Sequence, residues 1–551
     1  MNGLKEVVGV QSGSPLGIAT VAALTPSDWE IEIQDEEVED IDFDAQADVV
    51  GISMFNVQYS RALEIMREFK RRGRYVVTGG PYPTLCPERC IGLFDTVFQG
   101  EVEYTWPEFC RDFAQGVRKD RYVQVDHVDI VNSPTPRNDL LDPAVYVSFY
   151  IQTSRGCPFT CEFCDIIVTD GRRPRTKTVE QVLAEVESVY ATGGRLISFS
   201  DANLIGDPRY AKRLLTALRD WGLSRSFPIA FSCELTINVA DMPDILDLLQ
   251  EANFLTIYLG IESPRRDSLK SALKQVNIRG QGSLIDKIRR LQSRNLMIIA
   301  GMIVGFDADD KEIFKEQFEF LLEAGIPFTT SGILFAIEKT PLFYRLKSEG
   351  RLLDEDMSAF QVHGAADLNF VPKLMSVEEL KAGYNWMIRQ HYRYDNYRAR
   401  LVEAVRHWQK SKHLGAKPVR QLNFAVLRRV PKVVTHYLMS PREKRNFFFG
   451  TIWEVVQTGF TFQKLLVSVS FLLAHKHFHE FVTHTHGDPE TVTEAIVWPE
   501  VALPVESTAA TAKALQQSAA ANSPGSHVRT SKRLEMIGRS ANLKPASHAD
   551  H

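Results

Sequence analysis

Residues 155–165 read R-G-C-P-F-T-C-E-F-C-D, and their three cysteines, Cys157, Cys161 and Cys164, follow a C-x3-C-x2-C spacing. The run comes directly after an apolar segment, residues 147–152, that has the character of a β-strand. Three thiolates this close together, with no fourth cysteine nearby, can hold three irons of a [4Fe–4S] cluster and leave the fourth iron open to a ligand. A structural zinc site needs a fourth ligand, and no second C-x2-C pair or nearby histidine supplies one. The stretch therefore predicts a redox metal site at the end of a strand.

On the carboxyl side of the cysteines, short β-type runs alternate with amphipathic helical stretches. The expected strands are residues 147–152, 196–201, 230–235, 255–262, 297–306 and 328–336. Thr178 and Gln181 are spaced as a capping box, and Gly193-Gly194 ends the helix that follows. Because no hairpin signal intervenes, the repeated units favour a parallel sheet with right-handed crossovers. We expect a partial (β/α)6 barrel over residues 147–337.

On the amino side, residues 1–126 have the pattern of a second α/β domain, joined to the barrel by a linker at residues 127–146. A buried strand is expected at residues 48–53, a helix at 60–72 and a strand at 75–78, which ends in Gly79-Gly80. Glycines just past a strand allow a ligand to approach the backbone. The fold class is therefore mixed α/β.

Beyond residue 338 the pattern becomes helical and aromatic. Helices are expected at residues 376–391, 394–408, 422–437, 442–457 and 462–481. We interpret residues 338–498 as a separate helical domain. From residue 499 the chain turns rich in Ala, Ser and Thr, a composition that cannot bury enough surface to fold, so residues 499–551 are expected to be a disordered tail.

Composition limits the class of protein. The 551 residues carry a formal net charge of −5, which argues against a nucleic-acid polymer as the main partner. Seven cysteines, three of them in one run, do not resemble a disulfide framework, so we expect a cytoplasmic protein. Residues 1–26 lack the pattern of a signal peptide. The longest apolar run, residues 465–474, is too short to span a bilayer.

The carboxyl-terminal helices leave one alternative open. Five histidines in residues 475–486 alternate with other side chains, which favours an exposed helix end over a metal site. Residues 465–481, together with Phe447–Phe449 and the basic residues Arg442, Lys444 and Arg445, suggest a pair of interfacial helices at the inner face of a membrane. An ordinary helical core is the alternative.

The cysteine run, with Phe163 before its last cysteine, resembles the cluster motif of the radical S-adenosylmethionine superfamily. The resemblance implies that the open iron chelates the methionine amine and carboxylate, and that the reduced cluster yields a 5′-deoxyadenosyl radical. It also implies contacts to S-adenosylmethionine from residues near the cluster and at the strand ends. These are Phe163 within the cysteine run, Asp201 and Asn203 toward the methionyl amine, Glu234 toward the ribose, Gly260 and Glu262 in the next signature, and Gly305 toward adenine.

Simpler roles remain open for the strand-end residues. Asp201 and Asn203 also fit a capped turn, Glu234 fits a surface turn, and the glycines fit close packing. Glu262 is expected to be a buried carboxylate paired with a cation.

Two stretches of the first domain, residues 76–81 and 97–103, resemble the flavodoxin-like cobalamin-binding domain that precedes the radical core in one subfamily. The resemblance implies that cobalamin lies over the carboxyl ends of the strands. The residues implied to contact it are Ser53, Gly79, Gly80, Gly100 and Glu101. The D-x-H-x-x-G loop is missing and Q-S-G-S-P-L-G stands at residues 11–17, so cobalt would lack a histidine ligand. The first strand is expected to be short, and a domain that serves only as scaffold is the alternative.

Four further stretches most resemble the hopanoid C-2 methylase group: residues 161–166, 233–239, 260–264 and 339–342. The resemblance implies methyl transfer from S-adenosylmethionine, through cobalamin, to an unactivated carbon of an apolar substrate such as a hopanoid-like lipid, with an external low-potential electron donor. Two alternatives stay open. One is an oxidative cyclase or other radical reaction on a tetrapyrrole or natural product, and the other is a noncatalytic iron–sulfur electron carrier.

Overall fold

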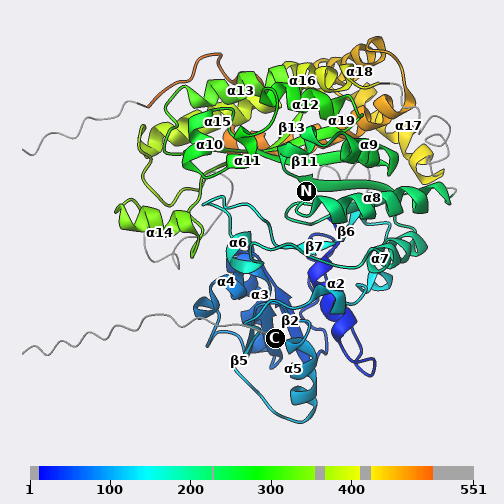
Figure 1. Cartoon of the computed structure of the whole chain (residues 1–551), viewed down its shortest axis with the longest axis vertical. Coiled ribbons are helices and arrows are strands. Elements are labelled where there is room, and N and C mark those ends of the chain that lie inside the picture. The colour runs from blue at the N-terminus through cyan, green and yellow to red at the C-terminus, as the bar shows by residue number, and fades with distance from the viewer. Residues whose placement is uncertain (1–10, 226–228, 354–366, 410–423, 500–551) are drawn as a thin grey trace, which may run out of the picture. The chain divides into compact units, whose positions relative to one another are not determined.

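A computed structural model describes residues 11–225, 229–353, 367–409 and 424–499. The expected tail, apart from its first residue, lies outside these ranges. Figure 1 shows the chain in order along its colour bar, with the first α/β domain in blue, most of the larger sheet and its helices in cyan to green, and the carboxyl-terminal helices from green at α14 through yellow to orange.

The larger sheet is parallel throughout, with the strand order β1-β6-β9-β10-β11-β12-β13. The strands are β1 (Gln11–Gly13), β6 (Tyr146–Ile151), β9 (Leu196–Phe199), β10 (Ala230–Leu235), β11 (Phe254–Glu262), β12 (Met297–Val304) and β13 (Phe328–Ile333). All six strands expected from the sequence are present, and the curled parallel half-barrel is confirmed. Several strands end two or three residues earlier than expected, where the chain turns toward the functional loops.

Helices cover one face of this sheet and leave the other face concave. They are α7 (Val179–Thr192), α8 (Pro208–Leu223), α9 (Pro243–Glu251), α12 (Leu284–Gln292) and α13 (Ile313–Ala324), with short helices α6 (Ile166–Thr169), α10 (Arg266–Ser271) and α11 (Gln275–Ile278) in the loops. Thr178 and Gln181 form the expected capping box, and Gly193 ends α7 in the left-handed conformation. Alternate strand residues and the apolar stripes of the helices form one buried cluster, in which each fully buried leucine contributes about 2 kcal/mol.

The first domain has a four-stranded parallel sheet in the order β2-β3-β4-β5. Its elements are β2 (Val49–Ser53), α3 (Tyr59–Arg71), β3 (Tyr75–Gly79), α4 (Pro81–Leu85), β4 (Thr96–Gln99), α5 (Thr105–Ala114) and β5 (Arg121–Val123). The expectation that this sheet begins with the first strand of the chain is wrong, because β1 pairs with β6 instead. Gly13 allows this pairing, since a Cβ there would overlap the ring of Tyr150 at 2.0 Å. Helix α2 (Leu16–Leu24) then leads back to α5.

The carboxyl-terminal part is helical, as expected, but it shares a core with the barrel. Its helices are α14 (Pro341–Ser348), α15 (Val377–Tyr392), α16 (Tyr394–Arg406), α17 (Phe424–Met439), α18 (Arg442–Gln457) and α19 (Phe462–His486). Tyr384 of α15 donates a hydrogen bond to the backbone oxygen of Ser331 in β13 (2.9 Å), and Phe478 of α19 packs on Phe328. Residues 338–498, predicted as a separate helical domain, therefore pack directly against the barrel within one compact unit.

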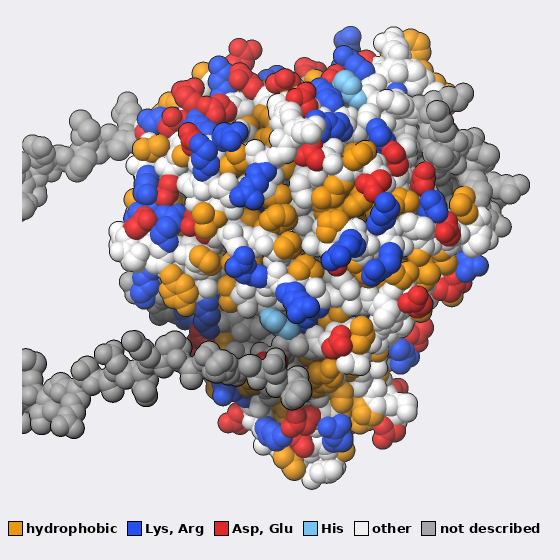
Figure 2. Space-filling view, in the orientation of Figure 1, with side chains coloured by type: hydrophobic (Ala, Val, Ile, Leu, Met, Phe, Trp, Pro, Cys, Tyr) orange, Lys and Arg blue, Asp and Glu red, His pale blue; other side chains and the backbone are white. Residues whose placement is uncertain are grey.

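The surface is mixed in charge. On the face shown in Figure 2, acidic and basic side chains are interspersed over most of the area, with apolar side chains between them. Among the described helices, none has the length and apolar character to cross a membrane.

Candidate functional site

The cysteine loop projects from the carboxyl end of β6. Strand β7 (Ser154–Arg155) pairs antiparallel with β8 (Arg175–Thr176), so these two short strands close the base of the loop. Gly156 adopts φ +93°, and a Cβ there would lie 2.7 Å from the backbone oxygen of Arg173. The Cys157 N–H donates to the backbone oxygen of Gly171 (3.1 Å). The first cysteine therefore begins a loop whose two ends are held together.

The three thiols of this loop are free and lie close to one another. Cys161 is 7% exposed, whereas Cys157 and Cys164 are half-buried. Burial raises the pKa of all three thiols, that of Cys164 to about 12, and the ammonium group of Lys274 opposes the rise at each. Cys161 interacts electrostatically with both other cysteines. The positive charge of Lys274 therefore lies where it would stabilise three thiolates.

This donor set fits a [4Fe–4S] cluster better than a single ion. Within the described ranges, no three His, Cys, Asp or Glu side chains converge as ligands of one metal ion. A cluster places each thiolate on a different iron, so it needs three neighbouring thiols rather than three that meet at a point. Cys157, Cys161 and Cys164 meet that requirement.

Lys274 is held beside the thiols by Glu262. Its Nζ lies 2.8 Å from the Glu262 carboxylate and 5.9 Å from the ring centre of Phe163. Gly260 makes room for this ion pair, because a Cβ there would lie 2.5 Å from Glu262 Oε1. The prediction that Glu262 pairs with a cation is confirmed. Phe163 packs against Phe306, at 6.0 Å between ring centres, which fixes the last turn of the loop.

The middle of the loop is tied to α14. Arg345 binds both carboxylate oxygens of Glu162 (2.7 and 2.9 Å) and also pairs with Asp307 (2.7 Å). The Leu342 N–H donates to the backbone oxygen of Glu162 (2.9 Å). Because the side chain of Glu162 is almost completely buried, this bidentate pair anchors the loop against the carboxyl-terminal part of the chain.

Asp201 supports the cysteine loop. Its carboxylate is 0% exposed and accepts hydrogen bonds from the backbone N–H and the hydroxyl groups of both Thr153 and Ser154. Asp201, predicted to face the methionyl amine of a ligand, thus binds the two residues that enter the loop. The end of β9 lies next to the end of β6. The backbone N–H groups that follow β6 have no partner in the sheet, so they donate hydrogen bonds to the Asp201 carboxylate.

Asn203 keeps a donor that the protein leaves free. Its Oδ1 accepts from the Thr236 N–H (3.3 Å), while its buried Nδ2 has no hydrogen-bond partner in the structure. A buried amide donor without a partner is costly and points to a missing acceptor. Asn203 is therefore a stronger ligand-contact candidate than Asp201.

The concave face of the half-barrel carries polar side chains at alternate strand positions. Ser198, Ser232, Glu234, Tyr258 and Thr330 point away from the helix-covered core, whose residues occupy the positions between them. The hydroxyl groups of Ser198 and Ser232 lie 2.6 Å apart. A Cβ on Gly301 would lie 2.7 Å from the Tyr258 hydroxyl. Sequence reasoning selected only Glu234, although the period of two along each expected strand could have identified the others.

Glu234 has a perturbed pKa on this face. Solvent reaches its side chain, yet the surrounding protein atoms and then the Asp201 carboxylate raise its pKa to about 7. The folded protein therefore disfavours the ionised form of Glu234. Because the unfolded chain ionises Glu234 at the ordinary pKa of 4.5, the free energy of unfolding falls as the pH rises from 4.5 toward 7.

Replacing Glu234 with Gln is expected to flatten this pH dependence. Between about pH 5 and pH 8 the unfolding temperature of the wild type should fall relative to that of the variant by about 2 °C, which corresponds to about 1 kcal/mol after allowance for solvent exposure. Scanning calorimetry of the two cofactor-free proteins across this range measures the difference. Parallel curves would show that Glu234 titrates at its ordinary pKa.

Gly305 ends β12 in the left-handed conformation, with φ +103°. Its N–H and that of Phe306 donate to the buried carboxylate of Asp309 (2.9 and 3.0 Å). Leu380 of α15 lies 3.2 Å from the position of a Cβ on Gly305. The glycine is thus required by the turn and by close packing at this strand end.

In the first domain, Ser53, Gly79 and Gly80 lie together at the carboxyl ends of β2 and β3. Gly80 has φ +103°, and a Cβ there would lie 2.9 Å from Ser53 Oγ. The next turn exposes the apolar side chains of Phe55 and Val57. Small residues beside exposed apolar ones suit a broad, flat ligand, so this edge fits a cobalamin.

Gly100 and Glu101, at the end of β4, are held within the protein. A Cβ on Gly100 would lie 2.4 Å from the Gln124 backbone oxygen. Glu101 binds Arg155 (2.8 Å) and Arg175 (2.9 Å) and accepts from the Val128 N–H (2.7 Å). Glu101, predicted to contact cobalamin, thus binds three groups of the protein itself. Burial would raise the pKa of Glu101, but the hydrogen bonds from Arg175 and Arg155 outweigh burial and lower it.

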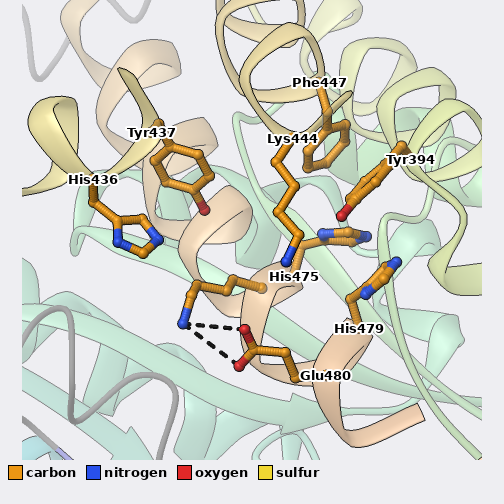
Figure 3. A pocket seen from close by; sticks show the side chains of 9 residues that line it. Tyr394, His436, Tyr437, Lys444, Phe447, His475, His479 and Glu480 are labelled. Atoms are coloured by element: carbon orange, nitrogen blue, oxygen red, sulfur yellow. Dashed lines mark hydrogen bonds and ion pairs between the residues drawn. The ribbon is translucent and has the colours of Figure 1, made fainter. Parts of the chain in front are cut away.

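The helices of the carboxyl-terminal part enclose a separate pocket. Figure 3 shows Lys444 reaching toward His475, with Tyr394 and His479 beside them. The pocket contains about 320 Å³ of empty space, its open mouth included. Its lining comes from helices α16 to α19: Tyr394, His436, Tyr437, Lys444, Phe447, His475, Lys476, His479 and Glu480.

Two of the histidines expected at an exposed helix end are buried. His475 is bonded to the Tyr392 backbone oxygen (2.8 Å), and His479 stacks on Tyr394. Burial lowers the pKa of His475 well below its ordinary value, so the ring stays neutral. They are core residues of α19 because they recur at a spacing of four, which places them on one helix face.

Models of known protein families match three successive regions of the chain. The model of the radical SAM superfamily matches residues 151–333, the B12-binding domain matches residues 7–109, and a domain of unknown function, DUF4070, matches residues 340–490.

Two curated relatives are similar over somewhat less than two thirds of this chain. The chain is 37% identical over 363 residues to an uncharacterized methyltransferase of Synechocystis, covering 65% of this chain and 67% of that protein. It is 33% identical over 349 residues to the hopanoid C-2 methylase of Rhodopseudomonas palustris, covering 62% of this chain and 66% of that protein. The matches thus span about two thirds of each relative.

A solved structure shares the fold. The radical S-adenosylmethionine methyltransferase TsrM of Kitasatospora setae, with cobalamin and a [4Fe–4S] cluster bound, superposes with a TM-score of 0.54 at 14% identity, covering 86% of this chain and 97% of that chain.

Proposed function

Since the chain belongs to the cobalamin-dependent radical S-adenosylmethionine methyltransferases, we propose that it methylates an unactivated carbon of a large apolar substrate. The observation that carries the proposal is the single loop that gathers three free thiols beside the Lys274–Glu262 ion pair, at the carboxyl edge of the half-barrel. The cobalamin-binding domain pairs with the base of this loop through Glu101 and Arg155.

Each part of the site has a role in this reaction. Cys157, Cys161 and Cys164 would hold a [4Fe–4S] cluster that cleaves S-adenosylmethionine, and the edge at Ser53 and Gly79-Gly80 would hold cobalamin as the methyl carrier. Lys274 offsets the negative charge of the thiolates, and Asp201 fixes the two residues that enter the loop.

The side chains on the concave face of the half-barrel support the proposal of an apolar substrate that has one polar end. Its polar side chains gather on β9, β10 and β11, with Thr330 on β13, whereas β12 presents Ile299 and Ile303 and β13 begins with Phe328 at the corresponding positions. Phe478 of α19 packs on Phe328 with 4.4 Å between ring centres. The similarity to the hopanoid methylase favours a polycyclic lipid within this class.

We also propose that the enzyme is cytoplasmic and contacts the inner face of a membrane through its carboxyl-terminal helices. Large apolar side chains are exposed on and between α17, α18 and α19: Leu438, Met439 (83% exposed), Trp453 (64%), Phe460 and Phe481. Arg442 and Arg445 lie on the same helices and would pair with anionic lipid headgroups.

Isotope labelling tests the reaction. We expect the anaerobically reconstituted protein, given cobalamin, a strong reductant, S-adenosylmethionine with a deuterated methyl group and a polycyclic lipid extract, to form 5′-deoxyadenosine and a lipid that carries the label, both detected by mass spectrometry. An unlabelled, oxidised product would instead support the cyclase. Absence of 5′-deoxyadenosine would support an electron carrier.

A further inference from the structure

A buried network of charges joins the cobalamin-binding domain to the cysteine loop. Arg155 binds Glu101 (2.8 Å) and Glu103 (2.7 Å), and Arg175 binds Glu101 (2.9 Å). Both arginines lie in the two short strands at the base of the cysteine loop, while both glutamates lie in the turn between β4 and α5 of the first domain. We name these four residues the clamp.

The clamp is shielded from solvent. The Glu103 side chain is 2% exposed, and those of Glu101, Arg155 and Arg175 are between 11% and 17% exposed. Further hydrogen bonds complete it, from Ser133 to Glu103 (2.8 Å) and from the Val128 N–H to Glu101 (2.7 Å). Buried, bidentate carboxylate–guanidinium pairs have a narrow range of geometries, unlike exposed ion pairs.

The clamp links the position of the cysteine loop to that of the first domain. Arg155 is two residues before Cys157, and Glu101 follows Gly100 at the end of β4, on the edge where β2 and β3 present Ser53 and Gly79-Gly80. A displacement of Glu101 would therefore change the separation between the cysteine loop and the proposed cobalamin edge.

A second attachment lies beyond the other end of the half-barrel. Glu338, which follows β13, binds Arg89 (3.1 Å) and accepts a hydrogen bond from the Cys86 thiol (2.7 Å). Lys339 pairs with Glu88 (3.1 Å). The first domain is thus attached near β6 by the clamp and after β13 by these pairs, and α4 also lies against α6 within the cysteine loop.

We propose that Glu101 and Glu103 are positioning residues that set the separation between the cluster loop and the cobalamin domain, and so couple cleavage of S-adenosylmethionine to methylation of cobalamin. The coupling rests on the proposed function, whereas the mechanical link between the two domains does not. Neither glutamate needs to touch a cofactor in this role.

The mechanical link is tested on the cofactor-free protein. In Glu101→Gln and Glu103→Gln, backbone amides of residues 154–176 are expected to exchange hydrogen for deuterium at least about tenfold faster than in the wild type, because the loop base loses its charged partners. Glu108→Gln is the matched control, since Glu108 forms an exposed pair with Lys119 (2.7 Å) in the same domain. Unchanged exchange in both clamp variants would overturn the proposal.

The coupling is tested on the reconstituted protein with two products of S-adenosylmethionine. S-adenosylhomocysteine forms when its methyl group is transferred to cobalamin, and 5′-deoxyadenosine forms when its sulfonium is cleaved reductively. We expect the clamp variants to lose at least about tenfold in S-adenosylhomocysteine while 5′-deoxyadenosine changes less than about twofold.

The outcomes separate the proposals. An equal fall of both products would mean that the glutamates only support folding of the loop, which overturns the coupling. If the wild type makes neither product, the proposed function fails, and the exchange measurement still decides the mechanical link.

Discussion

Replacing any one of Cys157, Cys161 and Cys164 with alanine is expected to lower 5′-deoxyadenosine formation by a factor on the order of 1000 or more, to the level without protein. Each thiolate is one of three that hold the cluster, and no fourth cysteine of the described residues lies in this loop to replace it. The measurement is 5′-deoxyadenosine by mass spectrometry after anaerobic reconstitution, together with bound iron and the absorbance of the cluster.

Cys233→Ala is the matched control. Cys233 is a buried thiol on β10 that faces the helix-covered core, away from the cysteine loop. Its loss removes one small apolar group, at a cost of about 1 kcal/mol, and should leave iron binding and product formation unchanged. Full activity in any of the three loop variants would exclude the cluster assignment.

The barrel could be predicted from the sequence because its signals are local. Runs of six to ten mostly apolar residues marked each strand, and Thr178 with Gln181 marked the start of α7. The cysteine run could be predicted for the same reason, since three ligands of one group lie within eight residues of each other.

Residues whose role depends on a distant partner could not be predicted in this way. Asp201 and Glu101 are carboxylates at strand ends, and nothing near them in the sequence shows that their partners are Thr153 and Arg155. Lys274 has no motif around it, yet it is the cation beside the thiols. The site is thus built on a locally encoded loop and on long-range polar contacts that only the fold brings together.

Strand β1 and the histidines of α19 show the same limit. Gly13 lies in a three-residue strand, and its pairing with β6 depends on the ring of Tyr150, more than a hundred residues away. His475 and His479 have the composition of a polar helix end, but aromatic side chains of α16 and α18 bury them. In both cases tertiary packing outweighs the local pattern.

Replacing Asp201 with alanine is expected to lower the free energy of unfolding by about 3–5 kcal/mol. The change leaves the N–H groups of Thr153 and Ser154 buried without an acceptor, at about 1–3 kcal/mol each, and adds a cavity. Urea unfolding monitored by circular dichroism measures the loss, and iron binding after reconstitution should fall with it, because these residues lead into the cysteine loop.

Two further variants sharpen the interpretation. Asp201→Asn keeps the shape and one acceptor oxygen but turns a donor toward the donors of Thr153 and Ser154, so its loss should be smaller than that of alanine yet measurable. Asp244→Ala removes an exposed pair with Lys212 (2.8 Å) and should change the free energy of unfolding by less than about 0.5 kcal/mol. If Asp201→Ala were as stable as Asp244→Ala, Asp201 would not be what holds the entry to the loop, and a contact with S-adenosylmethionine would again be its best explanation.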